Sequence, residues 1–506
     1  MRLSKLLSSL IAVRLPNGEW DGEIDSIVTD SAKAGEGCLF VCLRGPIRDG
    51  HTYAQKAYAR GCRHFLCEYP PALPPDAYVA YVPDCRPALA ALSGAWYGYP
   101  ERELTLIGIT GTKGKTTTAV MAYRLLREVG IPVGYIGSGG VWYADVQRES
   151  ENTTPDAPTL RAAFADMRRH GVRAVIMEVS SQAISCERIA GLSFPICLFT
   201  NLACDHVGEG EHPDFWHYRE AKARLFSDMG CRTMIANLDD PTAPYMMARA
   251  CATETVTLSC RRTDTSLYAT RLRENRQDGH FATSFMLGVE GEDCFPVSIP
   301  LPGECNVQNA LAALALAREF LQGYEKQQVP LRTLARLLSD VTVPGRFEAV
   351  RTPLPEVDFL IDYAHNGYSL AAALRALRAY SPARLCCLFG SVGERTYSRR
   401  TELAQAACAA DFCVVTADNP GTEPPEDTMR EICRVLEENG REYVAIPDRE
   451  EAIRYAVRHA RAGDVWLLAG KGHESYQLLG ERRVPFSERG ILLSAAAELV
   501  TVPLLQ

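Results

Sequence analysis

The stretch Leu104–Thr118, with the sequence LTLIGITGTKGKTTT, decides how this chain folds. It opens with Leu104–Ile109, a short apolar and partly β-branched run that is typical of a buried parallel strand. Glycines, lysines and threonines follow directly, and a helical pattern comes after them. A strand that passes through a glycine-rich turn into a helix predicts a cradle for the phosphates of a nucleoside triphosphate.

Each residue type in the turn has a physical task. Gly111 and Gly114 let the backbone fold tightly and point its N–H groups inward. Lys115 has the length to reach the β- and γ-phosphates, and the Thr116 hydroxyl is a ligand for Mg²⁺. The strict P-loop spacing would require a glycine at Ile109, so the turn is a P-loop variant. A glycine-rich turn without a ligand is the alternative, but the lysine–threonine pair favours nucleotide binding.

Composition excludes several classes of protein. The chain has 506 residues, enough for three or so domains of roughly 100 to 200 residues each. Its net charge is −8 and it has no basic block, so we expect no nucleic-acid partner. No apolar run approaches the ~20 residues of a membrane span, and no signal-peptide cleavage site follows the N-terminus. The 18 cysteines are scattered without a C-x-x-C pair, which indicates reduced thiols and a cytoplasmic protein.

The first hundred residues have a mixed α/β pattern. Short strands are expected at Cys38–Cys42 and His64–Cys67, and a helix at Tyr53–Arg60. Two polar clusters, Thr29–Ser31 and Asp49–His51, adjoin these strands. Taken alone, both clusters are typical of turns and helix caps rather than of a binding site.

Strand and helix patterns alternate after the glycine-rich turn. We expect a helix at Thr116–Val129 and strands at Ala174–Val179, Ile196–Thr200 and Thr233–Ala236. This alternation predicts a parallel sheet with helices on its faces. Functional side chains should then lie at the carboxyl ends of the strands.

Three polar side chains in this region are candidates for such a site. Glu178 ends an apolar strand, where a buried carboxylate is costly unless it is paired or bound to a cation, so it is a candidate Mg²⁺ ligand. His206 is a second candidate, although a lone histidine is more often structural. Lys222 is a third. A further polar loop, Asn152–Pro155, lies between two of the predicted strands.

The C-terminal third repeats the same architecture. Four apolar strands are expected at Phe359–Ile361, Leu385–Phe389, Cys413–Thr416 and Val465–Ala469. Each runs into a polar loop, with the sequences DYAHN, GSVGERT, ADNPGTE and GKGHE. The pattern predicts a second doubly wound α/β domain whose loops gather at one edge.

The motifs GTKGKTT, NTTPDA, MEVSS, TNLACDH, EAKARLF, LPGECNVQNALAA, VPGRFE, DYAHN, ADNP and AGKGHESYQ occur in this order. Together they closely resemble the Mur ligases of peptidoglycan synthesis, and among these the MurE type, which adds the third amino acid to UDP-N-acetylmuramoyl-L-alanyl-D-glutamate. The resemblance implies an α/β protein of three domains with hinges near residues 102 and 343. These would be a mixed α/β UDP-sugar domain (1–102), a P-loop ATPase-like domain with a parallel sheet (103–343) and a Rossmann-like amino-acid domain (344–506).

The resemblance also implies a role for individual residues. Thr116 and Glu178 would hold one Mg²⁺ ion, and His206 with Lys222 a second; in the family this lysine is carbamylated, which turns an ammonium into an oxygen ligand. The catalytic set would be Lys115, Lys222, His206 and Glu178. The ATP-binding set would be Gly111, Thr112, Lys113, Gly114, Lys115, Thr116, Thr117, Asn306, Asn309, Arg346 and Asp362. The UDP-sugar set would be Ser31, Asn152, Thr153, Thr154, Ser180 and Arg188, with Cys186 where the family often has glutamine. The amino-acid set would be Arg395, Asp418, Asn419, Gly421, Gly470 and Glu474.

Some interpretations stay open. Asn306 and Asn309 are equally explained as caps of a helix at Ala310–Phe320. Two other kinds of protein would share part of the pattern: folylpolyglutamate-type or other Mur-type ligases, and a ligase-like module that binds nucleotide and UDP-sugar without catalysis. The implied reaction is phosphoryl transfer from ATP to a carboxylate, followed by attack of an amine on the acyl phosphate. Its participants are ATP, Mg²⁺, the UDP-sugar dipeptide and a free amino acid. The enzyme is expected to be a monomer.

The amino acid is the least determined feature. Family members that use meso-diaminopimelate have the sequence DNPR where this chain has DNPG. Gly421 therefore replaces the arginine that binds the second carboxylate of diaminopimelate in those members. We therefore predict L-lysine, whose distal amine could pair with Glu423 or Glu426. Arg399 or Arg400 could instead supply a replacement cation for diaminopimelate.

Overall fold

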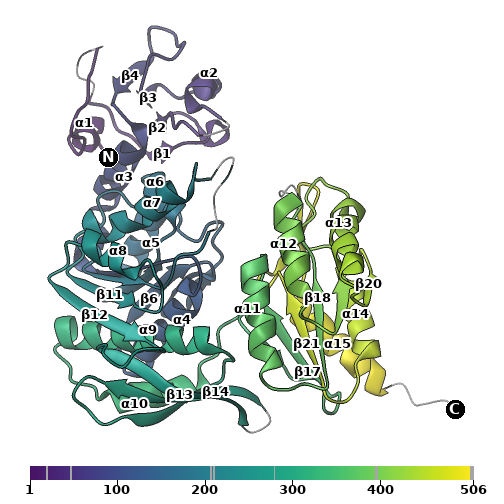
Figure 1. Ribbon diagram of the computed structural model, residues 1–506. Helices are drawn as coiled ribbons and strands as arrows, with labels where there is room; N and C mark the ends of the chain where they lie inside the picture. Colours follow the sequence, from purple (N-terminus) through teal and green to yellow (C-terminus); the bar gives the residue numbers. More distant parts are fainter. Residues whose placement is uncertain are drawn as a thin grey trace. The chain divides into compact units, whose positions relative to one another are not determined.

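A computed structural model describes residues 1–16, 18, 21–45, 48–204, 208, 211–277, 280–393 and 397–501 (Figure 1). The chain divides into two compact units. The first comprises Met1–Leu258 and Ala312–Gln328, and the second Ser259–Leu311 and Val329–Gln506. The three sheets described below confirm the α/β fold class, and the domain boundaries at 102 and 343 stay a prediction.

A four-stranded parallel sheet lies near the N-terminus. Its strands, in spatial order, are β1 (Ser26–Val28), β2 (Cys38–Val41), β3 (His64–Cys67) and β4 (Tyr78–Tyr81). Alternate residues face opposite sides, so Leu39 and Val41 pack against α1 (Leu3–Leu7) and α3 (Cys85–Tyr97). Phe40 and Phe65 pack on the other side, with α2 (Ala54–Ala59). The 3₁₀ turns η1 (Ser31–Lys33) and η2 (Gly50–Tyr53) are capped by the side chains of Asp30 and Asp49, which confirms the cap interpretation of both polar clusters.

The central sheet of the first unit has β5 (Thr105–Thr110) between two parallel neighbours, β9 (Ala174–Glu178) and β10 (Ile196–Phe199). The other strands of this unit are β6 (Val133–Gly137), β7 (Gly140–Tyr143), β8 (Val146–Arg148), β11 (Thr233–Asn237) and β12 (Glu254–Ser259), in the order β12-β11-β10-β5-β9-β6-β7-β8. The helices are α4 (Lys115–Glu128), α5 (Ala157–Arg169), α6 (Ser181–Ser185), α7 (Phe215–Ser227) and α8 (Ala243–Arg249). Because β5, β9 and β10 are parallel, their carboxyl ends meet at one edge.

The second unit contains a six-stranded sheet in the order β16-β17-β21-β18-β19-β20. Its strands are β16 (Glu348–Val350), β17 (Asp358–Asp362), β18 (Arg384–Phe389), β19 (Phe412–Val415), β20 (Tyr443–Ala445) and β21 (Asp464–Ala469), all parallel except β16. One face is covered by α11 (Gly367–Arg378), α12 (Tyr397–Ala407) and α13 (Pro425–Glu438). The other is covered by α14 (Arg449–His459) and α15 (Glu488–Thr501). Helices on both faces make the sheet doubly wound, as predicted.

The second unit also holds three antiparallel strands, β13 (Leu267–Gln277), β14 (His280–Val289) and β15 (Phe295–Ile299), and a hairpin of β22 (Tyr476–Leu479) and β23 (Arg482–Pro485). Helix α10 (Leu331–Arg336) precedes the six-stranded sheet. Helix α9 (Glu304–Phe320) crosses from one unit to the other along the chain. Among the described residues, no helix is both long enough and apolar enough to span a membrane.

The predicted elements agree with the structure to within a few residues, with two exceptions. The helix expected at Ala310–Phe320 begins six residues earlier, at Glu304. Asn306 and Asn309 therefore lie inside its first two turns, and their interpretation as caps of a helix at Ala310–Phe320 is wrong. The helix expected at Tyr53–Arg60 is a 3₁₀ turn followed by the short α2.

A buried ion pair fastens the C-terminal sheet to its last helix. Arg449 pairs with Glu488 at 2.8 Å, and it donates to the backbone oxygens of Ala469 (2.9 Å) and Ala417 (3.3 Å). Both charged groups are almost fully buried, and burial raises the pKa of Glu488. Removing one partner of such a pair leaves the other charge without compensation.

We expect Arg449→Met to destabilise this unit by about 3 to 5 kcal/mol, measured by chemical denaturation. The control is Arg458→Met, which removes the exposed pair with Glu451 and should cost less than about 1 kcal/mol. Equal losses in the two variants would contradict the role given to Arg449.

Candidate active site

The glycine-rich turn is held by the loop that follows the neighbouring strand β10. Asn201 Oδ1 accepts from the backbone N–H of Lys113 at 2.9 Å, and Asn201 Nδ2 donates to the Lys113 carbonyl at 3.0 Å. Thr200 Oγ1 donates to the same carbonyl at 2.7 Å. The Thr112 hydroxyl lies 3.0 Å from the Tyr218 hydroxyl of α7. These bonds within the protein hold the backbone of the turn in a defined conformation.

Gly111 permits the close approach between the turn and this loop. Its φ is +150°, and a Cβ at this position would overlap Thr200 Oγ1 and lie 2.9 Å from the Asn201 carbonyl oxygen. Gly114, with φ +84°, occupies the position just before α4. Both glycines are therefore required by geometry.

Gly111→Ala is expected to destabilise the first unit by about 2 to 4 kcal/mol, because the new methyl group forces the turn away from Thr200 and Asn201. Gly130→Ala is the matched control: its φ is +82° but nothing lies near a Cβ there, so it should cost only about 1 to 2 kcal/mol. Thermal denaturation compares the two. A smaller effect at Gly111 than at Gly130 would contradict the proposed overlap.

Glu178 is fully buried at the end of β9, as the sequence predicts. One of its oxygens accepts from Thr116 Oγ1 at 2.9 Å. The other accepts from Tyr135 Oη at 2.7 Å and from the Ser138 N–H at 3.0 Å. A hydroxyl and a buried carboxylate side by side at the start of α4 are hard oxygen donors, which fit Mg²⁺.

Two lysines converge on the glycine-rich turn. Lys115 Nζ donates to the carbonyls of Gly111 (2.8 Å) and Thr112 (3.1 Å). Lys222 Nζ, on α7, donates to the same Gly111 carbonyl at 2.9 Å and lies over the Tyr218 ring. Lys222 is only 2% exposed. The structure thus brings together two lysines that lie 107 positions apart in the sequence.

A cavity of about 150 Å³ joins the lysines to the residues expected to bind the UDP-sugar. Its lining from the predicted sets is Lys115, Asn152, Thr153, Ser180, Arg188 and Lys222. Four further lining residues were not predicted: Ser181, Gln182, Glu211 and His212. The motifs MEVSSQ and GEGEHP contain them, but their spacing gives no sign that they reach the cavity.

Thr154, in the segment between β8 and α5, bonds to two residues that line this cavity, Ser180 and Arg188. Its hydroxyl donates to the Glu178 carbonyl at 2.8 Å and accepts from the Ser180 N–H at 3.1 Å. Arg188 donates to the Thr154 carbonyl at 3.0 Å, and Thr153 Oγ1 lies 2.9 Å from Ser138 Oγ. Ser31, from the same predicted set, is half-buried at the start of η1.

The second unit holds the other residues predicted for ATP. Asn306 donates to the Pro302 carbonyl at 2.7 Å, and Asn309 donates to Asn306 Oδ1 at 3.1 Å. Asp362 accepts from the Phe347 N–H at 2.8 Å. The Arg346 guanidinium lies over the ring of Tyr363. Asn306 and Asn309 lie in the N-terminal part of α9, Asp362 ends β17, and Arg346 precedes β16.

Four of the described residues predicted for the amino acid form one polar cluster at the carboxyl ends of β19 and β21: Asp418, Asn419, Gly470 and Glu474. Its centre is Lys471, which was not predicted and is fully buried. Lys471 Nζ donates to Asn419 Oδ1 at 2.9 Å and to Glu474 Oε2 at 3.0 Å, and lies 3.7 Å from Asp418 Oδ1. Burial raises the pKa of Asp418. The Gly470 backbone, with φ +119°, passes close to Asp418, where a Cβ would lie 2.7 Å from Oδ2.

Gly421 adopts a left-handed conformation with φ +60°. Its N–H donates to the Leu478 carbonyl at 3.3 Å, and its carbonyl accepts from the Gly480 N–H at 2.8 Å. The loop is therefore tied by its backbone to the β22–β23 hairpin. An arginine in this conformation would be strained by about 1 to 2 kcal/mol.

Arg400 and Glu423, which were expected to contact the distal end of the amino acid, form an ion pair with each other. Arg400 is 5% exposed and pairs with Glu423 at 2.5 Å and with Glu431 at 3.0 Å. Arg399 is half-buried on α12, and Glu426 is exposed at the start of α13. His206 and Arg395 lie outside the described residues.

Comparisons with known proteins agree with this arrangement. A family model described as "Mur ligase middle domain" matches residues 109–317, and one described as "Mur ligase, glutamate ligase domain" matches residues 345–472. The UDP-N-acetylmuramoyl-L-alanyl-D-glutamate--2,6-diaminopimelate ligase of Geobacillus kaustophilus is 36% identical over 507 residues, covering 98% of this chain and 100% of the relative.

Solved structures extend the likeness to the fold. A UDP-N-acetylmuramoyl-L-alanyl-D-glutamate--2,6-diaminopimelate ligase structure has a TM-score of 0.65 at 28% identity, over 96% of this chain and 97% of that one. MurF ligase from Thermotoga maritima, solved in complex with ADP, has a TM-score of 0.59 at 17% identity, over 94% and 96% of the two chains. This second likeness concerns the fold alone.

Proposed function

The chain belongs to the Mur ligases and is a MurE-type, ATP-dependent enzyme that adds an amino acid to UDP-N-acetylmuramoyl-L-alanyl-D-glutamate; from that premise we propose that it adds a diamino acid. L-lysine is the first candidate for this diamino acid. One observation supports the ligase chemistry most strongly: Lys115 and Lys222 line the same cavity as Asn152, Thr153 and Arg188. This cavity joins the nucleotide cradle to the predicted sugar site within one unit.

We assign the phosphoryl-transfer step to the cradle. The γ-phosphoryl group of ATP passes to the glutamate carboxylate, which gives an acyl phosphate and ADP. Lys115 offsets the negative charge that spreads over the transferring group. Thr116 and Glu178 are the oxygen donors that would hold Mg²⁺, which supplies further charge neutralisation when bound. Attack of the incoming amine on the acyl phosphate then forms the amide and releases phosphate.

Lys222 is proposed to act as a carbamate. At 2% exposure an ammonium ion at Lys222 is costly unless it is compensated, and here the Gly111 carbonyl and the Tyr218 ring compensate it. A carbamate instead presents oxygen atoms, as Mg²⁺ requires, and would hold a second ion together with His206. The remaining assignments of the ATP and UDP-sugar sets, the domain boundaries at 102 and 343, a monomeric state and a cytoplasmic location are parts of the same proposal.

The amino acid would be held by the cluster around Lys471. Glu474 is assigned to its α-ammonium group and Arg395 to its α-carboxylate, because opposite charges at fixed positions orient the amine for attack. Asp418, Asn419 and Gly470 shape this cluster.

The preference for L-lysine rests on Gly421. This residue has no side chain with which to bind a second carboxylate, and Arg400 is engaged by Glu423 and Glu431. meso-Diaminopimelate is the second candidate, because the names of the most similar relatives carry it. Glu426, exposed near the same loop, is the acidic partner proposed for the distal amine of lysine.

A phosphate-release assay separates these candidates. ATP, Mg²⁺ and UDP-N-acetylmuramoyl-L-alanyl-D-glutamate are supplied with L-lysine, meso-diaminopimelate or other amino acids, and the product is identified by mass. We expect release that depends on both the dipeptide substrate and L-lysine. Release with meso-diaminopimelate alone would overturn the interpretation of Gly421. No release with any amino acid would contradict the proposed ligase chemistry of the cavity.

A further inference from the structure

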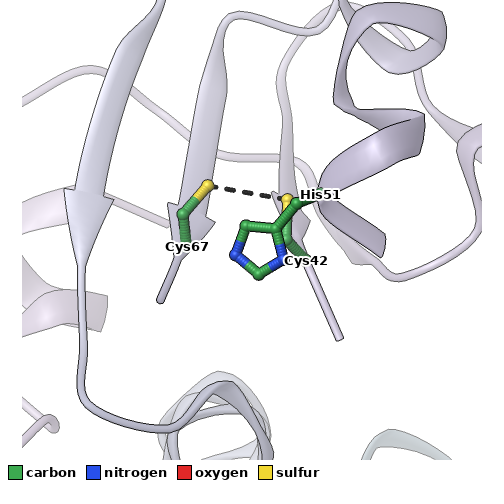
Figure 2. Close-up of side chains that lie close together, drawn as sticks. All are labelled: Cys42, His51 and Cys67. Carbon is green, nitrogen blue, oxygen red and sulfur yellow. Dashed lines mark hydrogen bonds between the residues drawn. The ribbon is translucent and has the colours of Figure 1, made fainter. Parts of the chain in front are cut away.

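Three side chains that the proposed function does not use meet in the N-terminal sheet: Cys42, His51 and Cys67 (Figure 2). Cys42 directly follows β2 and Cys67 ends β3. The pairing of Val41 with Leu66 brings the two cysteines opposite each other on these parallel strands. His51 lies on η2, in the segment between the two strands. All three side chains are buried, with exposures of 0%, 6% and 0%.

The distances within this cluster match those of a tetrahedral metal site. One ligand atom from each residue lies within 4.8 Å of the others, and the two sulfur atoms are 3.5 Å apart. With zinc–sulfur bonds of about 2.3 Å, two thiolates of a tetrahedral site lie about 3.8 Å apart. The sulfurs would therefore need to separate by only a few tenths of an ångström.

Hydrogen bonds around His51 select the form of the ring that binds metals. The Glu68 N–H donates to Nε2 at 3.0 Å, so Nε2 carries a lone pair. Nδ1 lies 2.7 Å from Asp49 Oδ1 and donates its proton to that carboxylate. Asp49 also accepts from the Tyr69 hydroxyl, and the Tyr69 ring stacks on His51 at 3.9 Å. A metal-bound histidine usually donates its other ring N–H to a carboxylate, which fixes the orientation of the ring.

We propose that Cys42, His51 and Cys67 bind one thiophilic divalent ion of the zinc class, with a water molecule or small anion as the fourth ligand. Two sulfurs and an imidazole are soft ligands and select zinc over Mg²⁺. Binding releases the two thiol protons to solvent, involves no change of oxidation state, and exchanges the Glu68 N–H for the metal at Nε2. The ion would link the ends of β2 and β3 to η2.

The protonation of the thiols sets the pH dependence of this site. Each thiol must lose its proton for the metal to bind, so affinity falls as the pH falls.

The test is a titration of the full-length, reduced and chelator-treated protein with Co²⁺. We expect about one equivalent to produce a thiolate-to-cobalt charge-transfer band with intense visible bands, and Zn²⁺ to abolish them. Cobalt at the proposed magnesium sites, which have no sulfur ligand, gives no thiolate band, so the nucleotide cradle does not interfere. Cys42→Ala and Cys67→Ala should lose the band, and Asp49→Asn should weaken binding about 10- to 100-fold.

Cys62→Ala is the matched control, because Cys62 is a thiol buried in the same core, donates to the backbone carbonyls of Cys38 and His64, and is not part of the cluster. It should keep the band. Circular dichroism checks the fold of every variant, and His51→Gln keeps both thiols if a cysteine variant fails to fold. Absence of the band in the folded, reduced wild-type protein would overturn the proposal. So would its persistence in Cys42→Ala, Cys67→Ala or His51→Gln.

Discussion

Replacing Lys115 by alanine is expected to lower kcat for ligation by at least about 1000-fold, equivalent to roughly 4 kcal/mol of transition-state stabilisation. The lysine lies at the start of α4, where its ammonium group is held by the carbonyls of Gly111 and Thr112. The variant lacks the charge proposed to offset negative charge during phosphoryl transfer, so that step should slow. Phosphate release at saturating substrates measures the effect.

Arg124→Ala is the control for Lys115→Ala, because Arg124 is exposed on the same helix. It should retain activity within a few-fold of the wild-type protein. The thermal stability of both variants is measured alongside, since Lys115 also ties the turn together. A folded Lys115→Ala variant with activity within tenfold of wild type would remove the role given to this lysine.

Lys222→Ala is expected to lower kcat by about 1000-fold as well, because the carbamate proposed at this position would contribute metal-binding oxygens close to the transferring phosphoryl group. Short carboxylic acids should restore part of the activity by placing a carboxylate in the space that the side chain leaves. The rescue is measured as phosphate release against acid concentration.

The Lys115→Ala variant serves as the control for this rescue. Lys115 acts as a cation, so an added carboxylate has nothing to replace and its activity should stay low. Rescue of both variants would show a nonspecific effect of the acids. Unchanged activity in Lys222→Ala would remove its assigned role, and loss of activity without any rescue would favour an ammonium form over a carbamate.

Much of the fold and part of the site could be predicted from the sequence. Leu104–Thr118 predicted β5, the turn and α4, because a buried strand, a glycine turn and a helix each have a local pattern. Glu178 could be placed at a strand end for the same reason. The MurE-type motifs identified the family correctly, as the 36% identity to the Geobacillus kaustophilus relative confirms.

Other features had no local signal. Glu211 and His212 line the cavity with Lys222, and Lys471 lies at the centre of the amino-acid cluster, but nothing in their sequence neighbourhood predicts these positions. The sequence suggests Glu423 and Arg400 as separate contacts for the substrate, yet these two residues, 23 positions apart in the chain, pair with each other. The sequence cannot show such a pairing, because a salt bridge depends on how α12 and the Asn419–Glu423 loop pack.

By itself, therefore, the sequence determined the order of strands and helices, the glycine-rich turn and the family. The strands, helices and turn follow from interactions between residues close along the chain, which periodicity reports directly. The family was identified from the resemblance of the motifs to known Mur ligases. Only the tertiary structure decided that Lys115 and Lys222 share one carbonyl, and that Cys42, His51 and Cys67 meet in a single cluster. The physical reason is strand pairing and helix packing: they bring distant residues within a few ångströms, and this proximity leaves no periodic trace in the sequence.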